Sequence, residues 1–143
     1  MIDNNRTDTA LVCKDFQDQV SQVLIRHKSI LDIITKLDQY NARINRALAK
    51  SVTNCGCISI NATKQDYDRD SFEEMLNAVN SHIEGTLCDN CKEVINEEIG
   101  SYFFYLAALC NSLDLDLDQI IKNEYNTIKT LGIYSLKWKV YLN

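Results

Sequence analysis

The chain has 143 residues, so we expect residues 1–143 to form a single domain that can bury a core of its own. Hydrophobic residues make up 45% and charged residues 24%, which is ordinary globular usage and excludes wholesale disorder. The net charge of −5 supplies no overall basic field, so binding to nucleic acid is not expected.

The predicted elements are helices, because the chain has no proline and only four glycines. Sandwiches and barrels need turn residues about every 8–12 positions, and this sequence lacks them. Residues 1–7 are expected to be frayed, and residues 133–143 to form a strand or an arm packed on a partner. Apolar residues recur at helical spacing over four segments, and a capping box indicates a fifth helix. In chain order, these predicted helices cover residues 9–26, 30–52, 71–84, 91–113 and 117–132.

Capping residues support two of the predicted boundaries. Ser29 with Asp32 resembles a capping box and indicates a new helix, although one unbroken helix through His27 is the alternative. Ser71 with Glu74 is a better capping box, and its helix is expected to run to about Glu84, with Gly85 as the residue that ends it. The predicted fold is therefore all-α: a bundle of four to five helices with short connections.

Six cysteines are the first chemical signal. The N-terminus has no apolar segment of signal-peptide length, and no run approaches a membrane span, so a cytoplasmic location without a membrane partner is expected. In that reducing compartment, cysteines indicate metal binding, redox chemistry or core burial before structural disulfides. Cys13 and Cys110 lie on apolar helical stripes and are expected in the core.

The other four cysteines form two close pairs. Cys55 and Cys57 lie in the segment between the second and third predicted helices, which is a loop or a short strand, and Cys88 and Cys91 precede or begin the next long helix. Four thiolates can close a tetrahedral structural Zn²⁺ site that would join these two segments. A redox pair is the first alternative, because Cys88 and Cys91 lie near a helix N-terminus, where thiol pKa values fall. Simple burial is the second.

Carboxylates form a further candidate site on the helix 91–113. Glu93 and Glu97 are four residues apart and share a face, and Glu98 and Ser101 share a neighbouring one. Carboxylates on facing helices can hold Mg²⁺ or Mn²⁺, which prefer oxygen ligands. The alternative is a solvated acidic face near a helix N-terminus, where the helix dipole favours glutamate.

The run from Glu97 to Leu109, followed by Leu-Asp-Leu-Asp at 115–118, resembles the C-terminal half of MazG-like nucleoside triphosphate pyrophosphohydrolases. The resemblance covers residues 30–130 loosely and 91–129 well. It implies an all-α homodimer that uses Mg²⁺ or Mn²⁺ to direct water onto a nucleoside triphosphate, releasing a monophosphate and pyrophosphate. The resemblance makes Glu97 and Glu98 catalytic metal ligands. It also assigns contacts with substrate phosphate to Lys122, Asn126 and Lys129.

The sequence departs from the family pattern at the predicted metal cage. Ser101 stands where the second acidic pair has an aspartate, and the helix 30–52 has no glutamate. Its nearest fit to the first acidic pair is Asp38 with Asn41, so Asp38 is at most a weak metal ligand. Fewer carboxylates make partly dehydrated Mg²⁺ harder to hold and metal-activated water harder to generate.

Basic residues on the same predicted helix oppose a cation further. Arg43, Arg46 and Lys50 share one stripe, which can bind an anionic ligand without any metal. Three functions therefore stay open. The first is a pyrophosphohydrolase with a weakened metal cage. The second is a catalytically inactive, zinc-stapled dimer that binds a nucleotide or a protein, and the third is a dithiol redox sensor.

Overall fold

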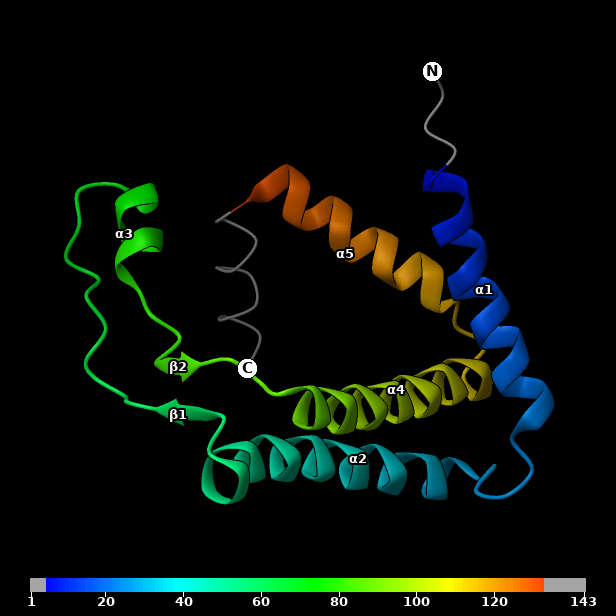
Figure 1. Cartoon of the computed structure of the whole chain (residues 1–143). Coiled ribbons are helices and arrows are strands. Elements are labelled where there is room, and N and C mark those ends of the chain that lie inside the picture. Colours follow the sequence, from blue (N-terminus) through cyan, green and yellow to red (C-terminus); the bar gives the residue numbers. More distant parts are fainter. Residues whose placement is uncertain (1–4, 133–143) are drawn as a thin grey trace. The chain divides into compact units, whose positions relative to one another are not determined.

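The computed structural model describes the backbone of residues 5–132 and the side chains of residues 12–132 (Figure 1). The predicted frayed start and C-terminal arm lie partly or wholly outside this range, at residues 1–4 and 133–143. The described part confirms the all-α prediction, with five α-helices and one two-stranded sheet. The helices are α1 (Asn5–Val23), α2 (Ile30–Lys50), α3 (Phe72–Ala78), α4 (Asp89–Ser112) and α5 (Leu117–Leu131).

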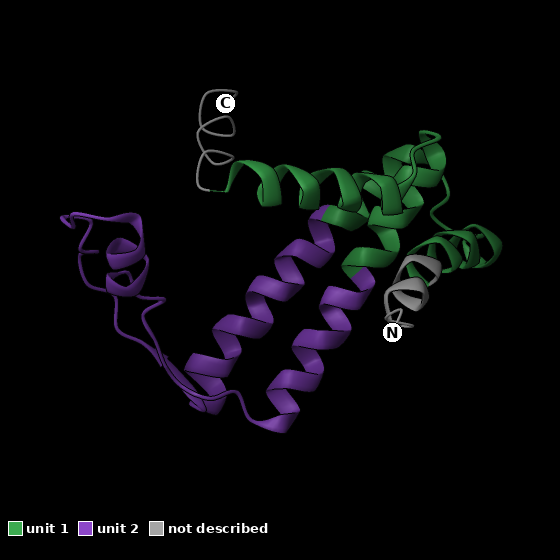
Figure 2. Ribbon diagram, turned by 90° about the horizontal axis from the view of Figure 1, so that it is seen from above, with its two compact units in different colours: residues 1–37, 102–143 green, residues 38–101 purple. Residues whose placement is uncertain are grey.

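The chain divides into two compact units, which Figure 2 colours separately. Unit 1 consists of residues 1–37 and 102–143, and unit 2 consists of residues 38–101. Both boundaries fall inside long helices, so α2 and α4 each contribute a segment to both units.

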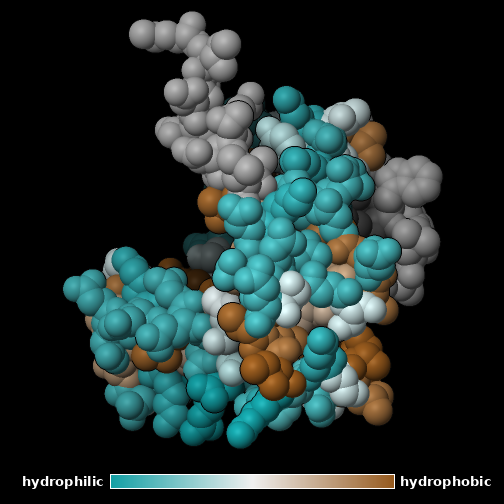
Figure 3. Space-filling model, turned by 90° about the vertical axis from the view of Figure 1, so that its right-hand side faces the viewer, coloured by the Kyte–Doolittle hydropathy of each residue, from teal (hydrophilic) through white to brown (hydrophobic). Residues whose placement is uncertain are grey.

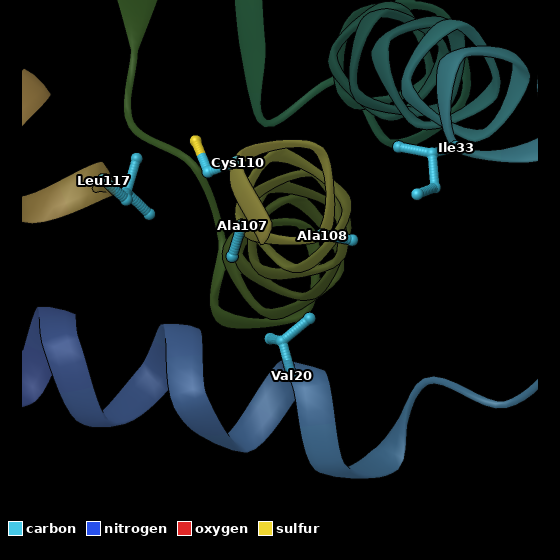
Figure 4. Close-up of a cluster of buried hydrophobic side chains, with 6 residues drawn as sticks. All are labelled: Val20, Ile33, Ala107, Ala108, Cys110 and Leu117. Carbon is cyan, nitrogen blue, oxygen red and sulfur yellow. The ribbon is translucent and has the colours of Figure 1, made fainter. Parts of the chain in front are cut away.

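Unit 1 has an apolar core around the C-terminal part of α4 (Figure 4). The small side chains of Ala107 and Ala108 leave room for residues of the neighbouring helices, and both alanines are buried. Cys110 is also buried, as predicted, whereas Cys13 is only partly buried. The cluster is completed by one side chain from each of the other three helices: Val20 of α1, Ile33 of α2 and Leu117 of α5.

Polar contacts of Gln17 join α1 to the turn between α4 and α5. Its amide nitrogen donates to Asn111 Oδ1 at 2.9 Å and to the Leu115 carbonyl at 2.7 Å. Its amide oxygen accepts from the Leu117 backbone N–H at 2.9 Å, and Asn111 returns a bond to the Gln17 carbonyl. One partly buried side chain therefore bonds two backbone groups of the turn, the Leu115 carbonyl and the Leu117 N–H.

Most predicted helix boundaries are confirmed. α2 begins at Ile30, directly after Ser29, so the helix is interrupted near His27. The Ser71 side chain accepts a hydrogen bond from the Glu74 backbone N–H and caps α3. The Asp116 side chain caps α5 in the same way.

The prediction for residues 71–84 was wrong at its C-terminal end. α3 stops at Ala78, and Ile83–Gly85 form strand β2 instead. The cause is local competition for backbone hydrogen bonds: the Asn80 N–H and carbonyl bond the Gln65 side chain, and the Asn80 side chain accepts from the His82 N–H. Strand β2 pairs in antiparallel register with β1 (Ile58–Ile60).

The surface carries many large apolar side chains. Figure 3 shows one face on which hydrophobic patches interrupt a mainly hydrophilic surface. On α5, half or nearly half of the surface of Ile121, Tyr125 and Ile128 is exposed. None of the described helices is both long enough and apolar enough to span a membrane.

Candidate metal centre and adjoining pocket

The four cysteines of the two predicted pairs come together in unit 2. The Sγ atoms of Cys55, Cys57, Cys88 and Cys91 all lie within 4.8 Å of one another. Cys55 Sγ lies 3.7 Å from Cys88 Sγ. Cys55 is exposed, whereas the other three thiols are at least partly buried.

These distances fit a tetrahedral metal site. With Zn–S bonds of about 2.3 Å, tetrahedral geometry places the sulfurs about 3.8 Å apart. The Cys55–Cys88 distance already has this value, and the widest separation exceeds it by about 1 Å. Small side-chain rotations would therefore bring all four sulfurs onto one ion. Four thiolates are ligands that suit zinc.

Local backbone geometry aims the first cysteine pair. At its C-terminus, α2 widens into a π-helical turn, η1 (Ser51–Cys55), which ends when the Gly56 N–H bonds the Ser51 carbonyl at 3.0 Å. Gly56 then adopts a left-handed conformation with φ 75°, which a residue without a side chain enters easily. Gly56 lies between the two cysteines, and the Sγ atoms of Cys55 and Cys57 belong to the same cluster.

The two-stranded sheet and the start of α4 supply the second pair. β1 follows Cys57, β2 leads back towards Cys88, and Cys91 lies in the first turn of α4 (Figure 1). Ile58 of β1 pairs with Gly85 of β2, so the sheet begins beside the cluster.

Gly85 permits this close approach of the strands. Its φ is +89°, and a Cβ built at this position would lie 2.7 Å from the Cys57 carbonyl oxygen. A side chain would therefore push β2 away from the backbone of a candidate metal ligand. The sequence predicted that Gly85 ends a helix, and this was wrong, because Gly85 lies in strand β2 and permits the strand pairing.

The thiols influence one another strongly in the metal-free cluster. The pKa of Cys88 falls to about 7, chiefly because its sulfur accepts the backbone N–H of Cys91, and also because neighbouring thiols donate to it. The pKa of Cys55 rises to about 12, chiefly because its proton is held in the hydrogen bond with Cys88. These contacts favour the thiolate of Cys88 over its protonated form, and the thiolate is the form that binds a metal.

A pocket of about 450 Å³ adjoins the cluster within unit 2. One wall is a stripe of α2 that carries Arg43, Arg46 and Lys50, the basic residues that the sequence placed on one face. The facing segment of α4 runs beside it (Figures 1 and 2). Two cysteines of the cluster also line the pocket; the remaining lining residues are Ala47, Ser51, Asn54, Asn90, Val94 and Glu98.

Glu98, a predicted metal ligand, is bound to an arginine. Arg43 Nε donates to one carboxylate oxygen at 2.8 Å, and Arg43 Nη2 donates to the other at 2.7 Å. The Glu98 side chain is 14% exposed and the Arg43 side chain 52% exposed, so water reaches the pair from the arginine side. The Glu98 bond raises the pKa of Arg43, which also lies 5.5 Å from the centre of the Tyr40 ring. Glu98 therefore holds Arg43 in place.

The remaining predicted ligands of Mg²⁺ do not form a cluster with Glu98. Glu97 and Asp38 are exposed. Among the described residues, the four cysteines form the only cluster of three or more side chains that could hold a metal ion, and it contains no carboxylate. The predicted phosphate-binding residues lie on α5, in unit 1. There, Lys122 pairs with Asp118 on its own helix, and Lys129 lies 5.9 Å from the centre of the Tyr125 ring.

Sequence reasoning missed several residues of the pocket. Asn54 continues the α2 stripe eleven residues after Arg43, and this helical spacing could have revealed it. Asn90 lies between the cysteines of the second pair, so its position beside the cluster could also have been predicted from the sequence. The pairing of Arg43 with Glu98 spans 55 residues and carries no local signal.

Comparisons of this chain with protein-family models, curated proteins and solved structures found no match.

Proposed function

We propose that this chain is a zinc-stapled helical binding module, a catalytically inactive relative of the MazG-like pyrophosphohydrolases. The observation that carries the proposal is the convergence of four thiols within 4.8 Å. Two of them follow α2, and the other two lie at the start of α4. One ion would therefore join two chain segments that are 33 residues apart, from Cys55 to Cys88. The ion is structural in this account, because four protein ligands leave no position for substrate or water.

The contacts of Glu98 favour the inactive form of the module over the enzyme. Both of its carboxylate oxygens accept hydrogen bonds from Arg43, and a second arginine and a lysine line the same pocket. A Mg²⁺ ion at Glu98 would have to displace this guanidinium and withstand the neighbouring positive charges. Ser101 also supplies no charge where the family pattern has an aspartate.

Two assays test this proposal together. Elemental analysis of the purified chain should find one zinc ion per chain, and each pairwise Cys→Ser variant of the cluster should lose it. Pyrophosphate release from a panel of nucleoside triphosphates with Mg²⁺ or Mn²⁺ should stay at background. Turnover that disappears in Glu98→Gln would instead support the pyrophosphohydrolase and overturn the inactive assignment.

The homodimer and the cytoplasmic location stay predictions. The exposed apolar side chains of α5, among them Ile121, Tyr125 and Ile128, are consistent with a surface that a second copy covers. Sedimentation equilibrium of the zinc-loaded protein tests the dimer directly, since it reports the mass of the assembly. A monomer at micromolar concentration would contradict it.

A further inference from the structure

The pocket beside the cysteine cluster has an excess of positive charge. Its lining contains three cationic side chains and one carboxylate, that of Glu98. Glu98 neutralises Arg43, and no acidic partner pairs with Arg46 or Lys50 among the residues that the structure describes. The wall of α2 therefore presents two uncompensated cations to the pocket. They are four residues apart, about one helical turn.

This charge pattern selects a dianion. A carboxylate would satisfy one of the two free cations, whereas a phosphate monoester carries close to two negative charges and enough oxygens to accept from both. Arg43 keeps its Nη1 group outside the bond with Glu98, which adds a further donor on the same wall. The pocket volume of about 450 Å³ lies within the usual range for small-molecule sites.

We propose that this pocket binds the phosphate group of a small phosphate monoester, held by Arg46 and Lys50, with Arg43 oriented by Glu98 as a further donor. This inference rests on the binding role proposed above and adds the class of ligand. The asparagines and the apolar side chain of Val94 remain to contact the rest of the ligand. The site is separate from the set on α5, Lys122, Asn126 and Lys129, to which the family resemblance assigned phosphate.

The test uses the full zinc-loaded chain and three ligand pairs that differ only in the phosphate: glycerol 3-phosphate with glycerol, ribose 5-phosphate with ribose, and AMP with adenosine. Calorimetric titration in magnesium-free buffer at physiological salt gives the affinities. At least one monoester should bind one per chain with a Kd below about 1 mM, and its partner without phosphate should bind at least about tenfold more weakly. Backbone amide shifts should be largest near Asn90 and Val94.

Matched double variants separate the pocket from general charge. Arg46→Gln with Lys50→Gln should weaken the monoester at least about tenfold, because each lost charge-assisted hydrogen bond is worth about that much. Lys64→Gln with Lys92→Gln removes the same charge from exposed positions of unit 2 outside the pocket, and should change the affinity less than about twofold. Circular dichroism confirms that both variants fold.

The outcomes distinguish this inference from the proposed function. Stoichiometric zinc without saturable binding of any monoester, or equal weakening by both double variants, would overturn the phosphate site and leave the zinc module standing. Binding without zinc in the purified chain would support the phosphate site and overturn the zinc assignment. Absence of both would overturn both.

Discussion

Replacing Gly85 by alanine tests whether the strand pairing positions the cysteine cluster. Gly85 has φ +89°, where an L-residue pays about 1–2 kcal/mol of backbone strain. The added Cβ would also lie 2.7 Å from the Cys57 carbonyl oxygen, a backbone atom that cannot rotate away. We therefore expect Gly85→Ala to lower the free energy of unfolding by about 3 kcal/mol in total.

The chain offers a matched control at Gly100, which lies within α4 and has nothing within 4 Å of an added Cβ. Gly100→Ala should raise the free energy of unfolding by about 0.5–1 kcal/mol, because alanine is the better helix former. Urea unfolding followed by circular dichroism measures both variants. Only Gly85→Ala should also give up zinc faster to a chelator. Wild-type stability and zinc retention in Gly85→Ala would refute the reasoning.

Three further predictions concern the metal cluster and unit 1. Cys88→Ser should abolish zinc binding and lower the Tm by about 15 °C, since opening a 33-residue loop costs about 4 kcal/mol, whereas Cys13→Ser should leave zinc bound. In metal-free protein near pH 7, iodoacetamide should modify Cys88 before Cys55, because the pKa of Cys88 is about 7 and that of Cys55 about 12. Mass spectrometry measures the order of modification, and the reverse order would contradict the hydrogen-bond arrangement. Gln17→Ala should lower the free energy of unfolding in urea by about 2 kcal/mol, whereas Gln19→Ala, at an exposed position, should lower it by about a few tenths of a kcal/mol. Equal effects would show that the Gln17 hydrogen bonds do not stabilise the fold.

The helices were predictable because their signals are local. Apolar spacing located four of the five, and the Ser71 capping box located the start of α3 within one residue. The end of α3 was not predictable in the same way. Its early stop depends on bonds between Gln65 and Asn80, which are 15 residues apart. Gly85 suits either a helix end or a tight strand pairing, and the sequence alone does not distinguish them.

Part of the candidate site could be predicted from the sequence, again because its signals are local. Two close cysteine pairs predict a metal cluster if the fold brings the pairs together, as it does here. The stripe of Arg43, Arg46 and Lys50 follows from helical spacing. The role of Glu98 could not be read from its spacing. A glutamate on a helix face has the same sequence pattern whether it binds a cation or an arginine, and only the structure brings Arg43 to it.

X-ray absorption spectroscopy at the zinc edge, combined with elemental analysis of the same sample, tests the central claim most directly. The four converging thiols predict one zinc ion per chain with four sulfur ligands at about 2.3 Å. A chain that folds with four free thiols or with a disulfide in the cluster, and without stoichiometric metal, would contradict the zinc-stapled module.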